Sequence, residues 1–108
     1  MTHYRMIVFS NPVAGQEDAF NHWYDERHIP DVLAIPGFVG AQRYRANPAR
    51  GEPPRGYLTI YDLETDDVTA VLADLKSRSR TEKMPISEAL APESITYLFE
   101  AIGPHVRA

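Results

Sequence analysis

The sequence predicts an α+β domain in which two helices cover one face of a four-stranded antiparallel sheet. Two observations lead to this prediction. Four short runs rich in β-branched and aromatic residues alternate with two longer runs in which apolar residues recur every three or four positions. The runs follow one another as strand, helix, strand, strand, helix, strand, and residues 1–108 suffice for a single domain.

The first strand and the first helix come from the N-terminal third of the chain. Tyr4 to Ser10 is rich in β-branched and aromatic residues and ends before an Asn-Pro pair, which predicts a strand buried on both faces. From Gln16 to His28, apolar and aromatic residues three and four positions apart form one helical face. Pro30 disfavours helical geometry in the residue before it, so the helix should break or kink there before one further turn. His28 is therefore expected at a helix terminus.

The rest of the chain predicts three strands and one helix. Phe38 to Arg45 and Tyr57 to Leu63 have the composition and alternation of strands. The loop between them, residues 46–56, is rich in Pro and Gly and long enough either to close over a pocket or merely to join two strands. Thr65 to Ser79 carries the apolar stripe of a second helix, and after an irregular stretch Ile95 to Ile102 forms the last strand.

This β-α-β-β-α-β order is the ferredoxin-like pattern, which places both helices on one face of the sheet and leaves the other uncovered. The alternation along the third strand assigns Tyr57, Thr59 and Tyr61 to the uncovered face. Such an aromatic surface is expected to be covered by a second copy of the chain. The sequence therefore predicts a homodimer with a cavity lined by polar aromatic residues.

The composition excludes several classes of partner. The net charge is −4, so binding to nucleic acid or to an anionic membrane surface is not expected. The chain has no cysteine, which excludes disulfides, thiolate nucleophiles and cysteine-bound metals. The N-terminal apolar run is too short for a signal peptide, and no stretch approaches the roughly 18 apolar residues of a membrane span. We expect a cytoplasmic protein.

The sequence holds no motif for a metal, a phosphate or an activated nucleophile. His3, His22 and His105 are spread along the chain without the spacing of metal ligands. No glycine-rich phosphate loop is present, and no serine lies in a nucleophile motif. The sequence therefore predicts neither a metal site nor a bound cofactor.

The stretch "FNHWYDERHIPDVLAIPGF", residues 20–38, resembles the N-terminal signature of the EthD-like branch of the dimeric α/β-barrel superfamily. That signature combines an aromatic pair, a histidine four residues after the second aromatic, a proline two residues further on, and Pro-Gly-Phe at the start of the second strand. The matching residues here are Trp23, Tyr24, His28, Pro30, Pro36, Gly37 and Phe38. The resemblance is good over roughly the first 63 residues and continues beyond them only in the order of elements.

The resemblance implies a sheet-to-sheet dimeric barrel with a small-molecule pocket in each subunit, between the first helix and the open sheet face. It also implies that His28 is the acid/base residue of that pocket. Related proteins include lactone isomerases, polyketide cyclases and dehydratases, cofactor-free oxygenases and dehalogenase-type enzymes. The resemblance therefore implies a fold and a pocket without naming a substrate.

His28 is the side chain best suited to transfer a proton near neutral pH. A histidine at a helix end can instead cap the last carbonyl groups. Tyr24 lies four residues earlier on the same helical face, where it could orient the imidazole, donate to a substrate oxygen, or simply pack at the core edge. Asp31 could hold one tautomer of His28 or cap the following turn.

Two further residues of the first helix are candidates for substrate binding. Trp23 is suited to the core or to the wall of a pocket. Arg27 falls in the middle of the aromatic face of the helix, which is an unusual place for a permanent charge. It either extends past the helix end to solvent or points into the pocket and binds an anionic oxygen.

The strands supply the remaining candidates for the pocket lining. Tyr57 and Thr59 would line it from the third strand, together with Tyr61 as a polarising group. Gln42 and Tyr44 of the second strand would join them. A shift of one residue in register would replace that pair by Arg43 and Arg45.

Together, the residues and the resemblance predict a cofactor-independent enzyme acting on a small aromatic, polyketide-like or lactone substrate. His28 would be the general acid/base, with Tyr24 and Tyr61 polarising a substrate oxygen. Removal of a proton next to a carbonyl, followed by elimination, isomerisation or cyclisation, needs only such groups. A non-catalytic small-molecule-binding or stress-response module and a cofactor-free monooxygenase remain as alternatives.

Overall fold

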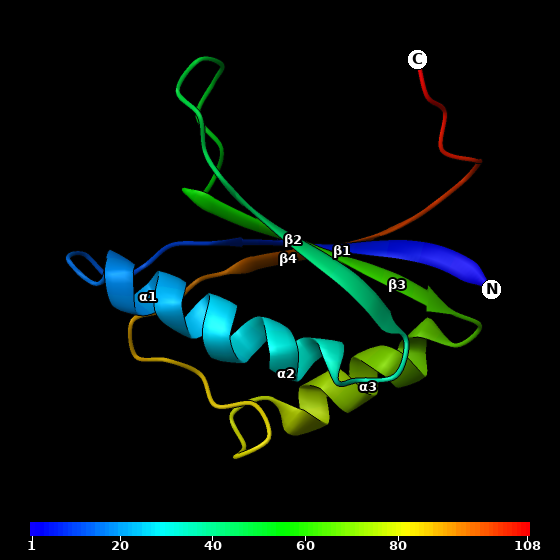
Figure 1. Ribbon diagram of the computed structural model, residues 1–108, viewed down its shortest axis with the longest axis horizontal. Coiled ribbons are helices and arrows are strands. Elements are labelled where there is room, and N and C mark those ends of the chain that lie inside the picture. The colour runs from blue at the N-terminus through cyan, green and yellow to red at the C-terminus, as the bar shows by residue number, and fades with distance from the viewer.

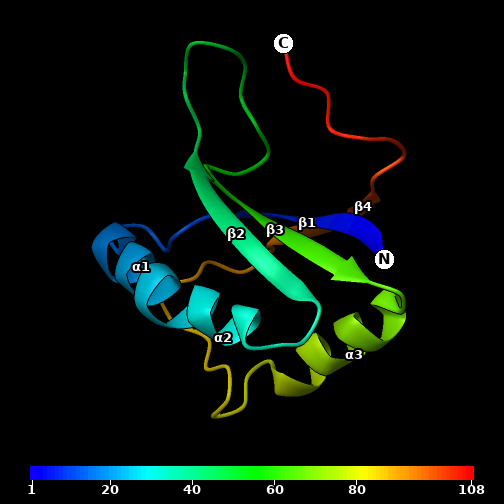
Figure 2. The ribbon, with the colours of Figure 1, turned by 45° about the vertical axis from the view of Figure 1, so that its right-hand side comes forward.

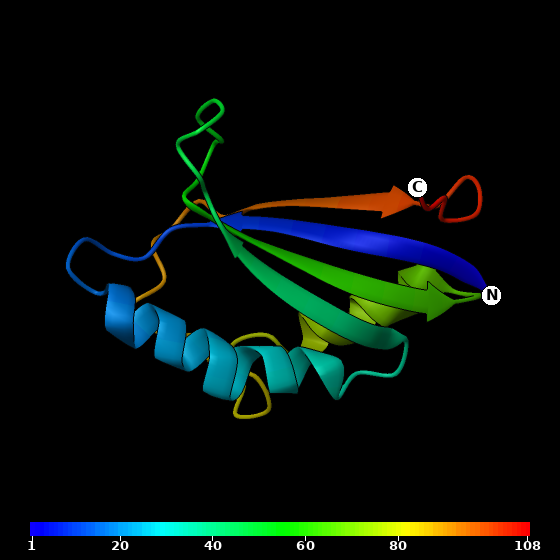
Figure 3. The same ribbon diagram turned by 45° about the horizontal axis from the view of Figure 1, so that its top comes forward.

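The computed structural model describes all residues from Met1 to Ala108, and the chain folds into two layers (Figure 1). One layer is a four-stranded antiparallel sheet in the order β2-β3-β1-β4. The helices all lie on one face of this sheet (Figure 3), so the predicted α+β, ferredoxin-like fold is confirmed. The elements are β1 (Thr2–Ser10), α1 (Glu17–Trp23), η1 (Tyr24–His28), α2 (Ile29–Leu33), β2 (Phe38–Arg45), β3 (Tyr57–Thr65), α3 (Val68–Arg78) and β4 (Ile95–Glu100).

The first helical segment is continuous from α1 through α2 and contains one π-helical turn, η1. The backbone N–H of Ile29 donates to the carbonyl of Tyr24, five residues earlier, which is the π-helical pattern. Pro30 follows directly and has no N–H to donate. The expected irregularity is therefore present, but the helix does not end there. His28 lies inside the helix, and its predicted place at a helix terminus is wrong.

The pairing of β1 with β3 decides which side chains face the helices. Tyr61 lies opposite Met6, a core residue, and both point into the helix layer. Thr59 and Tyr61 are each 1% exposed, so their predicted location on the uncovered face is wrong. The alternation of side chains along β3 was predicted correctly, but the two alternating sets were assigned to the wrong faces of the sheet. Large rings fill the space between sheet and helices, whereas Leu58 and Ile60 point outward.

A large part of the uncovered face of the sheet is apolar, because Leu58 and Ile60 of β3 point to it. Tyr97 and Phe99 of β4 are 52% and 60% exposed, and their ring centroids lie 6.5 Å apart. The register brings them into one surface with residues of the other three strands. We call this surface the open face; it consists of Ile7, Phe9, Tyr44, Leu58, Ile60, Ile95, Tyr97 and Phe99. A homodimer through the open face stays a prediction.

Two segments project from the sheet on the side away from the helices (Figures 1 and 2). One is the loop of residues 46–56, whose end is fixed by a 2.7 Å hydrogen bond from the backbone N–H of Gly56 to Asn11 Oδ1. The other is the C-terminal tail of residues 101–108, in which Ile102 is fully exposed. The loop of residues 46–56 is therefore not placed over the helix-covered side of the sheet.

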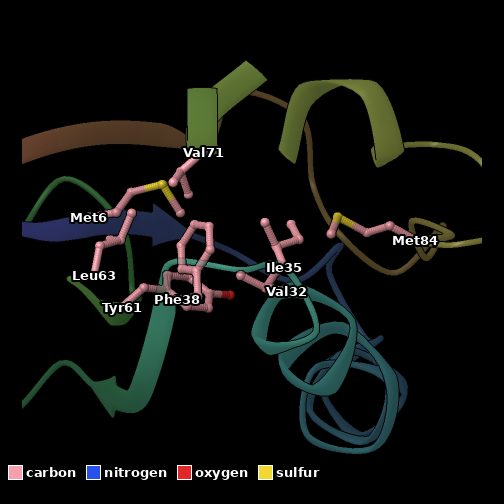
Figure 4. Close-up of a cluster of buried hydrophobic side chains, with 8 residues drawn as sticks. All are labelled: Met6, Val32, Ile35, Phe38, Tyr61, Leu63, Val71 and Met84. Atoms are coloured by element: carbon pink, nitrogen blue, oxygen red, sulfur yellow. The ribbon is translucent and has the colours of Figure 1, made fainter. Parts of the chain in front are cut away.

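The main core lies between the sheet and the segment from α2 to α3 (Figure 4). Gly37 allows the turn between α2 and β2 to approach α3 closely. Its φ is +106°, and a Cβ atom there would lie 2.7 Å from Cγ2 of Val71. None of the helices combines the length and the apolar character that a membrane span requires. The core cluster consists of Met6, Val32, Ile35, Phe38, Tyr61, Leu63, Val71 and Met84.

Candidate functional site

A cavity of about 530 Å³ lies between the sheet and the helix layer. This volume is typical of sites for small molecules. Its apolar wall comes from β1, α2, α3 and the irregular segment after α3: Met6, Val8, Val32, Leu75, Met84, Ile86, Leu90 and Ala91. The resemblance implied a pocket toward the open sheet face, and the structure places this cavity on the helix-covered face instead.

His28 lies on the wall of the cavity between two aromatic rings. Its imidazole stacks on the indole of Trp23 at a centroid distance of 4.6 Å and an angle of 25°. The edge contact with Tyr24 has a centroid distance of 5.1 Å and an angle of 89°. Residues five apart on an α-helix point in directions that differ by about 140°. The π-helical turn η1 is what brings Trp23 and His28 onto one face.

The imidazole of His28 is kept neutral. Burial lowers the pKa of His28 from 6.5 to about 4, and the nearby carboxylate of Asp31 opposes this only in part. Asp31 makes no hydrogen bond to the ring and instead accepts one of 2.6 Å from Arg27 Nε. Nδ1 of His28 is buried without any hydrogen-bond partner, so the ring caps no helix carbonyl through that atom.

Tyr24 and Tyr61 line the same cavity. The Tyr61 hydroxyl is also buried without a hydrogen-bond partner. Burial, and then the neighbouring Tyr24 hydroxyl, raise the pKa of Tyr61 well above its usual value. Tyr61 therefore stays protonated and can donate a hydrogen bond. The three side chains predicted as catalytic thus meet at one cavity, although Tyr61 reaches it from the face opposite to the one predicted.

Similarity to known proteins is found in structure and not in sequence. No protein-family model matches the chain, and no curated protein matches it significantly. The heme-degrader MhuD from Mycobacterium tuberculosis superimposes with a TM-score of 0.64 at 19% identity, over 95% of this chain and 99% of that chain. An EthD family protein from Bacillus halodurans gives 0.51 at 17% identity, over 94% and 100% of the chains. A candidate antibiotic biosynthesis monooxygenase from Nitrosomonas europaea gives 0.62 at 13% identity, over 94% and 92%.

The chain has the ferredoxin-like fold of these proteins. The resemblance to the EthD-like group that residues 20–38 suggested is thus confirmed at the level of the fold. Identities this low say nothing about which reaction the cavity supports.

Within this ferredoxin-like fold, two predicted substrate-binding residues of the first helix do not line the cavity. Trp23 lies behind His28 and donates a 3.1 Å hydrogen bond from Nε1 to the carbonyl of Pro85. Arg27 points away from the cavity, where its guanidinium donates to Asp31 and to the carbonyl of Glu82. Of the two alternatives for Arg27, the structure therefore has the outward one.

The strand residues predicted as lining are also placed elsewhere. Gln42 and Tyr44 lie opposite Ile60 and Leu58, on the uncovered side of the sheet, so the predicted contact with the cavity is wrong. Of the two registers that the sequence left open, the structure has the one in which Arg43 points to the same face as Thr59, toward the helices. Tyr57 faces the helices too, but its ring packs against Phe20 at 5.2 Å, and like the buried Thr59 it does not line the cavity.

Arg43 has a structural role that the sequence did not reveal. Its guanidinium lies 4.5 Å from the ring centroid of Tyr24 and contacts two further rings. It also donates to Asn21 Oδ1 at 2.8 Å and to Asp25 Oδ1 at 2.9 Å. Arg43 thus links β2 to α1 and η1, and it fixes the position of the Tyr24 ring at the cavity.

The part of the wall that the sequence analysis missed is the irregular segment of residues 80–93, which we call the covering segment. It contributes Met84, Ile86 and Leu90 to the cavity. The signal was present: apolar residues recur through a stretch that has too many prolines for a helix or a strand. The mouth adds one cation, Arg80, and two carboxylates, Glu88 and Glu93.

No group of three or more His, Cys, Asp or Glu residues is arranged to hold a metal ion. His28 is the only histidine on the cavity wall. The site can therefore bind an apolar molecule, offer it the hydroxyl groups of Tyr24 and Tyr61, and exchange a proton with it through a neutral imidazole.

Proposed function

We propose that the chain is an enzyme that binds a small, largely apolar molecule in this cavity and moves a proton by means of His28. One observation carries the proposal. His28 Nδ1 and the Tyr61 hydroxyl are buried without partners, and both residues line the same cavity. A buried polar group without a partner is costly to the fold, by about 1–3 kcal/mol, and is retained more readily where a ligand can supply the missing hydrogen bond.

The cavity favours a substrate with an apolar body and one reactive oxygen function. The apolar wall suits an aromatic ring, a polyketide-like chain or a lactone. Tyr61 stays neutral, so its hydroxyl can donate to a carbonyl or enolate oxygen. Tyr24 is a second donor at the same wall.

His28 would remove a proton next to the carbonyl and return it to another atom of the substrate. That sequence conserves all atoms in an isomerisation or cyclisation. In an elimination, the imidazolium gives the abstracted proton to the leaving group, which departs with it. A pKa near 4 makes the empty-site imidazole a weak base. The negative charge of the enolate, together with Asp31, would stabilise the imidazolium that forms.

A heme cofactor suits these residues poorly, although MhuD is described with two hemes in its active site. The two propionates of heme are anionic, whereas the mouth of the cavity has two carboxylates, Glu88 and Glu93, against one cation, Arg80. Cofactor-free oxygenation and binding without chemistry are separate outcomes of the test below.

The test is a thermal-shift screen of small phenols, lactones and acyl aromatics, followed by turnover assays on the compounds that bind. The variants are His28→Asn and Tyr61→Phe. The matched control is His22→Asn, which changes an exposed histidine six residues earlier in the same helical segment. Compounds should stabilise wild type and the control and be consumed by both. His28→Asn should lose turnover by about a hundredfold or more, the usual contribution of a general acid/base.

Other outcomes separate the alternatives. Binding without any turnover would make the chain a binding module. Oxygen consumption with a phenolic substrate would identify a monooxygenase. Equal turnover by wild type and His28→Asn would refute the role of His28.

A further inference from the structure

The covering segment is held in a strained backbone conformation at both of its ends. Arg80 and Glu93 have φ values of 64° and 70°, and they are the only residues other than glycine with positive φ. Both line the cavity. Residues in this conformation collect at functional sites and at segments that switch between two positions.

Three side chains from the rest of the fold hold the covering segment through its carbonyl groups. Arg55 donates two hydrogen bonds to the carbonyl of Glu93, at 2.8 and 3.2 Å. Arg27 donates to the carbonyl of Glu82 at 2.8 Å, and Trp23 to that of Pro85 at 3.1 Å. Of these three, only Trp23 also contacts the ring of His28.

The indole of Trp23 is therefore shared between the covering segment and His28. One edge is bonded to Pro85, and one face is stacked on the imidazole at 4.6 Å. Because the indole is a rigid ring, any movement of the edge that is bonded to Pro85 also moves the face that is stacked on His28. Displacement of the segment would move the indole and release the imidazole, whose Nδ1 would then gain access to water.

We propose that Trp23 is a positioning residue, which fixes the His28 ring at the cavity wall only while the covering segment is closed. Trp23 does not line the cavity, so it acts through His28 and not on the ligand. This inference rests on the proposed function of His28 for its significance, but it is tested without any substrate, so either can fail alone.

The test is an NMR titration of the His28 ring in Trp23→Phe, which removes the hydrogen bond to Pro85 and keeps an aromatic ring. The control is Arg55→Lys, which weakens a different anchor of the same segment and keeps the charge. Neither variant alters the charged groups near His28 and the cavity: Asp31, Arg27, Arg80, Glu88 and Glu93. The pKa of His28 should rise by about one unit or more in Trp23→Phe, as hydration returns, and by less in Arg55→Lys, which leaves the bond between Trp23 and Pro85 in place.

No shift in Trp23→Phe would overturn the proposal, and so would an equal shift in both variants. If Trp23→Phe does not fold, the link between Trp23 and His28 is tested by an NMR titration of the wild-type protein. The indole N–H signal of Trp23 reports on the bond to Pro85, and it should move with the same midpoint as the His28 ring. An indole signal that ignores the titration of His28 would refute the link.

Discussion

At the scale of the residue, the site depends on polar groups that the fold leaves without partners. His28 is half-buried between Trp23 and Tyr24, and no carboxylate or carbonyl satisfies its buried Nδ1. The sequence singled out His28, Tyr24 and Tyr61 through their residue types and spacing. It could not tell that Asp31 pairs with Arg27 and not with His28, because both residues lie within one turn of Asp31.

Burial of neutral His28 makes the stability of the fold depend on pH. The pKa of His28 is about 4 in the folded chain and near 6.5 when unfolded, so the unfolded state binds more protons between these values. Stability is therefore full above pH 6.5 and falls as pH decreases toward 4. The shift of about 2.5 units corresponds to a loss on the order of 3 kcal/mol.

Urea unfolding at several pH values checks this expectation. His28→Asn should flatten the dependence between pH 6.5 and 4, whereas the exposed His22→Asn should keep it. Asp62 also has a lowered pKa: burial raises it, but hydrogen bonds from Arg5 and His3 lower it by more. Titration of Asp62 therefore changes the stability of the fold only below pH 3.8, outside the range in which His28 acts. A slope that is the same in wild type and His28→Asn would show that His28 is not buried in neutral form.

At the scale of the element, the sequence predicted the order and type of the strands and helices, but not the π-helical turn or the faces to which the side chains of β3 point. The periodicity of each segment predicted the strands and helices, since it arises from which side of each segment is buried. A π-helical turn has no comparable signal, because it changes the helix by one residue per turn only. The sequence also could not show which set of β3 side chains faces the helices. Tyr57, Thr59 and Tyr61 alternate with Leu58 and Ile60 whichever set faces them.

The left-handed backbone at Glu93 gives a prediction about the covering segment. At this position Glu93→Gly should be more stable than Glu93→Ala by about 1 kcal/mol, because a Cβ atom is unfavourable at positive φ. The carbonyl that accepts from Arg55 remains in both variants. At Ala73, which is exposed in α3, the order should reverse, with Ala73→Gly less stable by about 1 kcal/mol. Denaturant unfolding measures both pairs, and alanine equal to glycine at position 93 would mean that this end is not strained.

At the scale of the whole molecule, the open face is the feature that still lacks a partner. It carries Phe99, Tyr97 and Ile60 among other apolar side chains, and the loop of residues 46–56 and the C-terminal tail rise beside it (Figure 1). The sequence predicted a covered second face, although it assigned the wrong side chains to it. A covered second face is expected on either assignment, because each of the two alternating sets of β3 side chains is too apolar to face water.

A homodimer through this face is therefore expected. Ile60→Lys should convert the dimer to a monomer, because it places a charge at the centre of an apolar surface. Ala73→Lys, on the exposed side of α3, should remain dimeric. Sedimentation of the two variants beside wild type decides the matter, and a monomeric wild type would exclude the homodimer.

The proposed ligand site lies between the helices and the sheet, and not on the open face. The chain has three methionines, of which Met6 and Met84 line the cavity while Met1 is 90% exposed. With ¹³C-labelled methionine methyl groups, a compound from the screen should shift the signals of Met6 and Met84 and leave that of Met1 unchanged. A compound that binds without moving Met6 or Met84 would place the ligand elsewhere and contradict the account.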